Sequence, residues 1–226
     1  MIRQLITLGA TVILVPYVLS QVRKPTRWVG RFFLWTMNQS HSSLTDWGLE
    51  HVQIEKEFAI LDVGCGGGRT IEKLALVASE GRVFGVDYSL GSVEASRARN
   101  ARLIEAGRVE IRHASVSSLP FPDATFDLVT AVETHYYWPD LPRDILEVVR
   151  VLRPGGVLIV IAESYKGSKN DLVQRPAMAL LRAVHMSVDE HRQWFQNAGL
   201  GDVQVFEERD QGWICVIGRK PPTAAT

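Results

Sequence analysis

The feature that most constrains the fold of this chain is a run of glycines between an apolar segment and an amphipathic one. Residues 58–63 are nearly all apolar, Gly64, Gly66 and Gly68 follow, and residues 70–79 carry apolar side chains at helical spacing. A short apolar run that stops at glycines is typical of a buried parallel strand. Glycines also permit a tight turn and a close approach of the backbone to a ligand. The run therefore predicts a strand, a turn and a helix.

Strand and helix patterns alternate from residue 58 to residue 162. The expected strands lie at 58–63, 82–86, 109–113, 126–132 and 157–162, and the expected helices lie at 70–79, 90–106 and 143–152. Such alternation implies right-handed crossovers and a parallel sheet with helices on both faces. We therefore expect an α/β fold with a doubly wound, Rossmann-like sheet.

The C-terminal part departs from this alternation. A helix capped at Ser187 is expected to run to about Asn197, and two strands at 203–206 and 213–217 follow with only a short polar turn between them. Strands joined in this way form a hairpin, so the last strand should enter the sheet antiparallel to its neighbours. Seven strands with a terminal hairpin distinguish the expected fold from an ordinary dinucleotide-binding domain.

The glycine run has the chemistry of a nucleoside site. Asp87 ends the second expected strand, 23 residues after Gly64, where a carboxylate can accept both hydroxyls of a ribose. The glycine spacing differs from the dinucleotide fingerprint, because Arg69 stands where a pyrophosphate-binding glycine is expected. Asp62, just before the turn, suits a positively charged ligand better than a pyrophosphate. These features together favour a ligand site over a bare turn.

With these residues the chain resembles the class I S-adenosylmethionine-dependent methyltransferases. Asp62 and the three glycines resemble motif I of that family, and Asp87 resembles the acid that ends its second strand. Residues 118–129 resemble the stretch leading into the fourth strand of the small-molecule branch, which includes ubiquinone/menaquinone-type enzymes, and residues 152–158 resemble the turn before its fifth strand. The resemblance covers residues 45–219 and is specific for fold and cofactor, though not for substrate.

The resemblance implies S-adenosylmethionine as the cofactor. Many relatives carry an acid at the end of the third strand that contacts adenine, whereas Ser115 stands here, so the Ser115 hydroxyl and the Val116 backbone would take that role. Glu133 would contact the amino group of the cofactor. The expected cofactor contacts are Asp62, Gly64, Cys65, Gly66, Gly68, Asp87, Tyr88, Ser115, Val116 and Glu133.

Residues 133–138 follow the fourth strand, where the family places the methyl group. His135 is the best candidate for a general base there, with Tyr136 and Tyr137 as further catalytic candidates, although a histidine at such a place is more often a packed or hydrogen-bonded residue. Aromatic rings at this place can stabilise a sulfonium through cation–π contacts. We expect the acceptor pocket to lie between residues 135–138, residues 41–47 and a mobile cover at 163–185.

The chain begins with an apolar segment that needs protection from water. Residues 1–22 are expected to form a helix that anchors the protein to a membrane, packs on the domain or a second copy, or is a cleaved signal. Basic residues follow it and favour a cytosolic position for the body. Residues 23–56 are expected to form a basic and aromatic helical cap, residues 57–220 the methyltransferase domain, and residues 221–226 a tail.

Charge and composition narrow the partners. The formal net charge is zero, and the body after residue 50 is slightly acidic, which disfavours nucleic acid as a partner. The two cysteines, Cys65 and Cys215, cannot build a cysteine-rich zinc site, and no metal is expected. We therefore expect a cytoplasmic enzyme, with residues 1–22 as an optional membrane attachment. It would methylate an oxygen, nitrogen or sulfur atom of a small, hydrophobic acceptor. The alternative is a non-catalytic domain that binds S-adenosylmethionine and acts through a protein partner.

Overall fold

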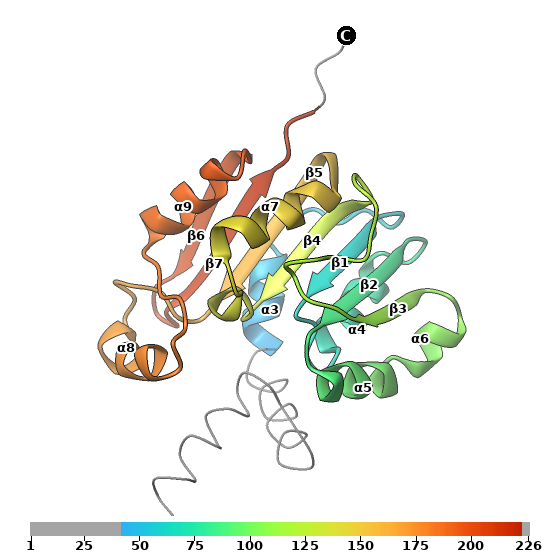
Figure 1. Ribbon diagram of the computed structural model, residues 1–226, viewed down its shortest axis with the longest axis horizontal. Helices are drawn as coiled ribbons and strands as arrows, with labels where there is room; N and C mark the ends of the chain where they lie inside the picture. Colours follow the sequence, from blue (N-terminus) through green and yellow to red (C-terminus); the bar gives the residue numbers. More distant parts are fainter. Residues whose placement is uncertain (1–41, 223–226) are drawn as a thin grey trace, which may run out of the picture.

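The computed structural model describes residues 42–222, which form a seven-stranded sheet in the order β3-β2-β1-β4-β5-β7-β6 (Figure 1). Strands β1 to β5 are parallel, and β7 runs antiparallel to both of its neighbours, β5 and β6. This order confirms the doubly wound sheet and the terminal hairpin. The strands are β1 (Ala59–Val63), β2 (Arg82–Asp87), β3 (Val109–His113), β4 (Phe126–Val132), β5 (Leu152–Ala162), β6 (Gly201–Glu208) and β7 (Trp213–Arg219).

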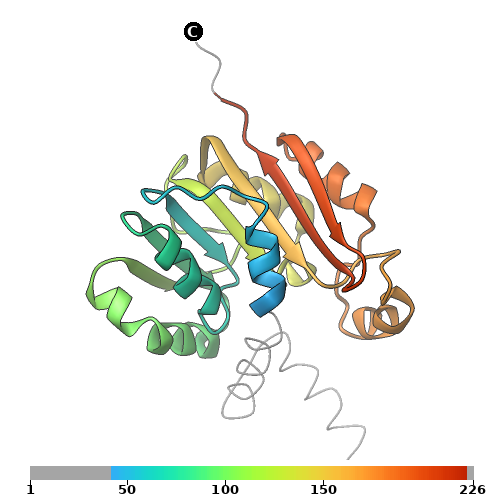
Figure 2. The same cartoon turned by 180° about the vertical axis from the view of Figure 1, so that it is seen from behind.

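Helices cover both faces of the sheet (Figures 1 and 2). One face carries α7 and α9, and the other carries α3, α4 and α5. The helices are α3 (Ser42–Leu49), α4 (Arg69–Val77), α5 (Leu90–Arg99), α6 (Ala101–Glu105), α7 (Leu141–Val151), α8 (Asp171–Leu180) and α9 (Val188–Asn197), with a 3₁₀ turn, η1, at His135–Tyr137.

The core consists of two apolar layers, one on each face of the sheet. In β5, Leu158 and Val160 pack toward the side of α7 and α9, whereas Ile159 and Ile161 pack toward the side of α3 and α4. Successive side chains of a strand point to opposite faces, so a strand buried on both faces must be apolar throughout. The continuous apolar runs in the sequence therefore correspond to the central strands.

Two expectations for the elements are wrong in detail. The helix expected at 90–106 is broken at Asn100, whose side-chain amide donates to the carbonyl oxygens of Gly68 and Ser96 instead of facing water. The cover expected at 163–185 contains a regular helix, α8, which the sequence did not indicate. The break at Asn100 arises from its contact with Gly68, which is distant in the sequence. The helix α8 gives no amphipathic pattern of the usual kind, because its apolar side chains face outward.

Several expectations concern residues that the structure does not describe. Those for residues 1–22, for His41, for the first part of 23–56 and for 223–226 lie outside the described range. Within residues 42–222, no helix is long and apolar enough to cross a membrane. The only described part of the expected cap is α3 and the turn after it, where Lys73 of α4 donates to the Ser42 carbonyl oxygen at 3.0 Å.

Candidate active site

The glycine loop between β1 and α4 folds onto the end of β2. The amides of Gly64 and Cys65 both donate to the Val86 carbonyl oxygen, at 2.8 and 3.0 Å, and the Gly68 amide donates to the Cys65 carbonyl oxygen at 2.9 Å. These bonds hold the loop at the carboxyl ends of the parallel strands, the edge at which open α/β sheets bind their ligands.

The three glycines of the loop have different reasons to be glycine. All three have positive φ, of 75° at Gly64, 50° at Gly66 and 77° at Gly68. A Cβ at Gly64 would lie 2.8 Å from Thr134 Cβ, and a Cβ at Gly68 would lie 2.9 Å from Ser96 Cα, so packing excludes larger residues there. A Cβ at Gly66 would have no neighbour nearer than 4.0 Å. Gly66 therefore faces open space, where a ligand can reach the backbone.

Asp87 lies directly against this open glycine. Its Oδ2 accepts from the Gly66 amide at 3.0 Å and its Oδ1 accepts from the Ser89 amide at 2.8 Å. The side chain is buried, and that burial raises the pKa of the carboxyl group, although both amides oppose the shift. Two backbone bonds thus fix the orientation of the carboxylate at the edge of the loop.

Asp62 places a second carboxyl group beneath the same loop. Its Oδ1 accepts from Thr130 Oγ1 at 2.7 Å, and the side chain is only 2% exposed. Burial raises its pKa to about 7, with a smaller contribution from the nearby Asp87. Two acidic groups with raised pKa values under one loop are stabilised in their ionised form by a bound cation.

The third strand brings the expected adenine contacts to the same edge. The Ala114 amide donates to the Asp87 carbonyl oxygen at 3.1 Å, so the chain after β3 lies beside the end of β2. Ser115 Oγ accepts from the Ser117 amide at 3.2 Å, Val116 is buried, and Tyr88 is 43% exposed. The structure therefore brings Tyr88 and the segment that contains Ser115 and Val116 to the same edge of the sheet as Asp87.

Cys65 lies in the loop but its side chain points into the core. The thiol is buried, and an added Cβ at Gly85 would lie 3.0 Å from its sulfur. Burial raises the pKa of the thiol well above its usual value. Cys65 can contact a ligand only through its backbone.

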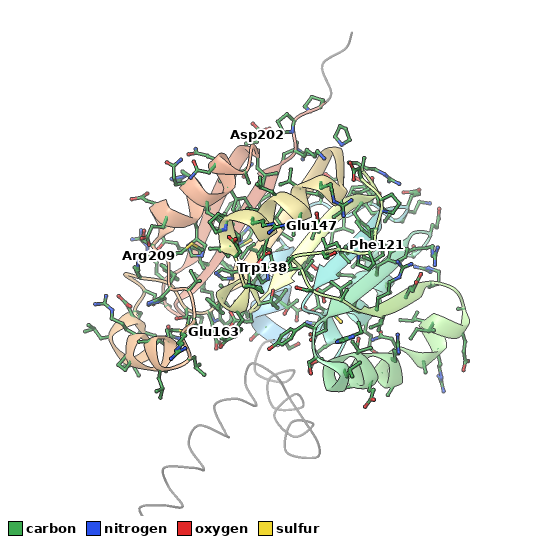
Figure 3. All side chains as sticks on the ribbon, viewed as in Figure 1. Phe121, Trp138, Glu147, Glu163, Asp202 and Arg209 are labelled. Atoms are coloured by element: carbon green, nitrogen blue, oxygen red, sulfur yellow. The ribbon has the colours of Figure 1, made fainter. Side chains whose placement is uncertain are left out.

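Glu133 is held in a strained conformation at the end of β4. Its φ is 58°, a region that residues other than glycine rarely occupy. Its Oε1 accepts from the Glu163 amide at 2.5 Å and from the Tyr136 hydroxyl at 3.2 Å. Glu163, labelled in Figure 3, directly follows β5, so the carboxylate links the ends of two central strands.

Tyr136 positions this carboxylate. Its hydroxyl donates to Glu133 and accepts from the Ser164 amide at 2.9 Å. The ring is 4% exposed, and burial raises the pKa of the phenol well above 10. Tyr137 packs edge-on against Tyr136, with ring centroids 6.0 Å apart. A buried phenol with this pKa stays protonated near neutral pH, so it cannot accept a proton from a substrate.

His135 points into the core and away from the open side of the site. It is fully buried, and its Nε2 lies 3.3 Å from Nε2 of His191. The other nitrogen of His191, Nδ1, lies 2.8 Å from the Ser187 carbonyl oxygen and so carries the proton of a neutral ring. Burial lowers the pKa of His135. The expectation of a base at His135 does not agree with this geometry, which is that of a packed residue.

His185 is a site residue that the sequence did not single out. Its Nε2 lies 3.4 Å from Ser164 Oγ and 3.7 Å from Oδ1 of Asp171. Asp171 in turn accepts from the Gly167 amide and from Arg175, at 3.0 and 2.8 Å. His185 thus contacts Ser164, the residue that follows Glu163, whose amide donates to Glu133. Its only sequence signal is its place at the end of the expected cover.

Buried side-chain oxygens without a hydrogen-bond partner occur in the segment around Asp171. They include Ser168 Oγ, Asp171 Oδ1 and Gln174 Oε1, which lie within seven residues of the sequence, and Asp171 Oδ1 is the one that lies 3.7 Å from Nε2 of His185. Gln174 Nε2 donates to the Glu163 carbonyl oxygen at 3.1 Å, which ties this cluster to the end of β5. Buried polar groups are normally hydrogen-bonded, so such a cluster can bind a polar ligand or water.

A hollow also lies at the opposite edge of the sheet. It has a volume of about 340 Å³ and is lined by residues such as His51, Asp127, Gly155 and Arg219. None of the site residues predicted from the sequence lines it, and it lies at the amino ends of β4 and β5. We therefore assign the site from the residues at the carboxyl edge and not from the volume of this hollow.

Comparison with known proteins agrees with the geometry at the carboxyl edge. Residues 61–160 match the family described as a methyltransferase domain. Over these residues the chain is a methyltransferase domain, and it is similar to S-adenosylmethionine-dependent methyltransferases. The matched residues include the glycine loop, Asp87 and β4, so the family likeness rests on the part of the chain that forms the cofactor side of the site.

Among curated relatives, the chain is 30% identical over 169 residues to a 27-O-demethylrifamycin SV methyltransferase of Amycolatopsis mediterranei, covering 73% of this chain and 62% of the relative. It is 41% identical over 106 residues to a demethylmenaquinone methyltransferase of Symbiobacterium thermophilum, covering 46% and 42%. The chain therefore matches less than two thirds of the length of either relative. A chain in the complex between the Haloferax volcanii Trm112 methyltransferase activator and the putative methyltransferase shares the fold, with a TM-score of 0.75, 21% identity and coverage of 86% and 96%.

Proposed function

We propose that this chain transfers a methyl group from S-adenosylmethionine to a hydroxyl oxygen of a small, apolar acceptor. The observation that carries the proposal is the contact between Asp87 and the Gly66 amide. It places a buried carboxylate, which can accept from ribose hydroxyls, beside a loop backbone that is open to a ligand.

The cofactor contacts follow from this contact. Asp87 would bind the ribose, and Tyr88, Ser115 and Val116 would surround the adenine. The Asp62 carboxyl group beneath the loop would stabilise the positive charge of the methionine part. Glu133 would accept from the amino group of the cofactor, and its bonds to the Tyr136 hydroxyl and the Glu163 amide, which fix its carboxylate, support this role.

Methyl transfer from a sulfonium is an in-line displacement. The acceptor oxygen forms a bond to the methyl carbon, the bond from carbon to sulfur breaks, its electron pair stays on sulfur, and S-adenosylhomocysteine leaves. The proton of the acceptor hydroxyl needs a base. We propose His185, oriented by Asp171, as this base in place of His135.

Several observations support His185 over the residues expected from the sequence. It lies beside Ser164, whose amide donates to Tyr136, and beside Asp171, whose segment contains buried oxygens without hydrogen-bond partners that can bind a polar acceptor group. Burial lowers the pKa of His185, although the carboxylate of Asp171 opposes this shift. The imidazole is therefore neutral near pH 7 and able to accept a proton.

The choice of an oxygen nucleophile has its support in the names of relatives. These include the 27-O-demethylrifamycin SV methyltransferase and an O-methyltransferase of Penicillium expansum, which is 29% identical over 153 residues. The demethylmenaquinone methyltransferase acts on an apolar molecule and supports an apolar acceptor. Attachment to a membrane or a second copy through residues 1–22, with the domain in the cytosol, remains part of this proposal.

The experiment is a screen for formation of S-adenosylhomocysteine with phenols, quinols, aliphatic alcohols, thiols and amines. The proposal predicts turnover with a hydroxyl compound and none with the matching methyl ether. Turnover only with amines or thiols would contradict the oxygen nucleophile. Binding of S-adenosylmethionine without turnover on any acceptor would favour the non-catalytic alternative, in which the domain acts through a partner.

A further inference from the structure

Helix α8 presents an apolar face to solvent. Leu172, Val173 and Leu180 are 84%, 82% and 64% exposed. Every exposed residue of this helix is apolar except Arg175. Helices on the surface of a soluble domain normally have the opposite arrangement, and contiguous exposed apolar patches mark interaction surfaces.

The helical repeat places these side chains together on one side. Residues 172, 173, 176 and 180 lie within about 100° of each other at the ordinary rotation per residue. The opposite side of the helix carries Asp171 and Met178, which are both buried. Helix α8 therefore already has a partner for its inner face in the domain, and its outer face is left for another surface.

Basic residues flank the apolar face in the sequence. Residues 166–182 include Lys166, Lys169, Arg175 and Arg182 against a single acid, Asp171. Arg175 pairs with Asp171 at 2.8 Å and Lys166 pairs with Glu190 at 2.9 Å, so Lys169 and Arg182 remain as the cations of this stretch without a carboxylate partner among the described residues. An apolar face bordered by cations is complementary to an anionic lipid surface.

The position of α8 in the fold fits the same partner. It lies beyond the carboxyl end of β5, at the edge where the glycine loop and the start of α3 also lie (Figures 1 and 2). The sequence that precedes α3 contains the apolar residues 5–19 and the basic residues Arg23, Lys24, Arg27 and Arg31. The chain thus enters the domain from the edge to which α8 belongs, with the same combination of apolar and basic residues.

We propose that the outer face of α8 docks on an anionic lipid bilayer, with Leu172, Val173 and Leu180 entering the interface. This contact would orient the carboxyl edge of the sheet toward the bilayer, where an apolar acceptor is concentrated. The docking surface does not depend on which acceptor is methylated, so it can fail while the proposed function holds.

The experiment uses the full chain with a polarity-sensitive dye on a single introduced cysteine. The test variant is Val173→Cys, and the matched control is Leu76→Cys on α4, where Leu76 is 72% exposed but lies on a different helix. The native Cys65 and Cys215 are buried, so labelling favours the introduced thiol. The probe is a vesicle of phosphatidylcholine and phosphatidylglycerol in equal parts, with or without a lipid-borne nitroxide quencher.

The proposal predicts that the dye at position 173 is water-exposed without vesicles and shifts to shorter wavelength when vesicles are added. The nitroxide should then quench it, whereas the dye at position 76 should change in neither respect. A dye at position 173 that stays water-exposed with vesicles overturns the proposal. So does one that is already shielded without vesicles, since residues 1–41 or a second copy would then cover the face.

Discussion

The candidate site has a cofactor half and an acceptor half, and the two differ in the kind of groups that form them. The cofactor half, between β1 and β3, consists of loop backbone and two carboxyl groups, and its key contact joins Asp87 to the Gly66 amide. The acceptor half, between β4 and α9, consists of aromatic and histidine side chains packed against one another, such as His135 against Tyr136. Backbone geometry restricts the first half to a few residue types, whereas many combinations of side chains could fill the second.

This difference suits the two roles that the proposed reaction requires. The cofactor is the same molecule in every member of such a family, so a rigid loop with fixed donors suits it. An acceptor varies, and α8 and His185 lie in a different segment of the chain from the glycine loop. The shared boundary is Glu133, which directly follows β4 and accepts from the Glu163 amide after β5.

The largest expected effect concerns the acceptor half. His185→Gln should lower kcat by about a hundredfold to ten-thousandfold, because a general base is lost, while binding of S-adenosylhomocysteine stays unchanged. Steady-state kinetics with an acceptor from the screen, together with calorimetry, measures both. His135→Gln is the matched variant and should lower the unfolding temperature far more than it alters the pH profile of kcat. Wild-type kcat in His185→Gln would remove the proposed base.

Adding a single methyl group to the glycine loop of the cofactor half should lower the stability of the protein. Gly64→Ala forces a side chain at a φ of 75° into Thr134 and should reduce the free energy of unfolding by about 2–4 kcal/mol. Gly107→Ala is the control, since its φ is 72° but an added Cβ meets nothing within 4 Å. It should lose only about 1 kcal/mol for the backbone conformation. Chemical denaturation compares the two, and equal losses would show that the packing on Thr134 is unimportant.

Asp87→Ala tests the ribose contact. Loss of a charge-assisted hydrogen bond should weaken binding of S-adenosylmethionine by about 2–3 kcal/mol. Because Asp87 also accepts from the Gly66 and Ser89 amides, thermal unfolding must accompany the calorimetry. Asp127→Ala is a suitable control at the opposite edge of the sheet. Binding by Asp87→Ala that equals the parent would remove the assignment.

A separate effect, on the pH dependence of stability, arises from Asp62. Its pKa in the folded protein is about 7, compared with 3.8 for an unperturbed aspartic acid. Between these values the unfolded chain has released the proton and the native protein still holds it, so stability falls as pH rises from about 4 to about 7. Asp62→Asn should flatten that part of the stability profile, measured by denaturation at several pH values. An unchanged slope would contradict the raised pKa.

Most of the fold could be predicted from the sequence because its signals are local. The apolar runs of β1 to β5, the glycines of the loop and the Ser187 cap of α9 each act over a few residues, and the capping box at Ser187 is present. The break at Asn100 was missed because it depends on Gly68, 32 residues away.

The candidate site could be predicted only on its cofactor side. The positions of Asp62, the glycines and Asp87 in one site could be predicted because strand ends and turns bring these residues together. The orientation of His135 could not be predicted, since it depends on His191, 56 residues away. His185 was missed for the same reason, because only the folded chain brings it to Ser164 and Asp171.

A crystal structure of the full chain with S-adenosylhomocysteine tests the central claim most directly. The account predicts the ribose hydroxyls on Asp87, the ligand backbone against Gly66, and the sulfur facing the space between Glu133 and His185. A ligand in the hollow beside His51 and Arg219 at the opposite edge, or one that leaves Asp87 without contact, would contradict it.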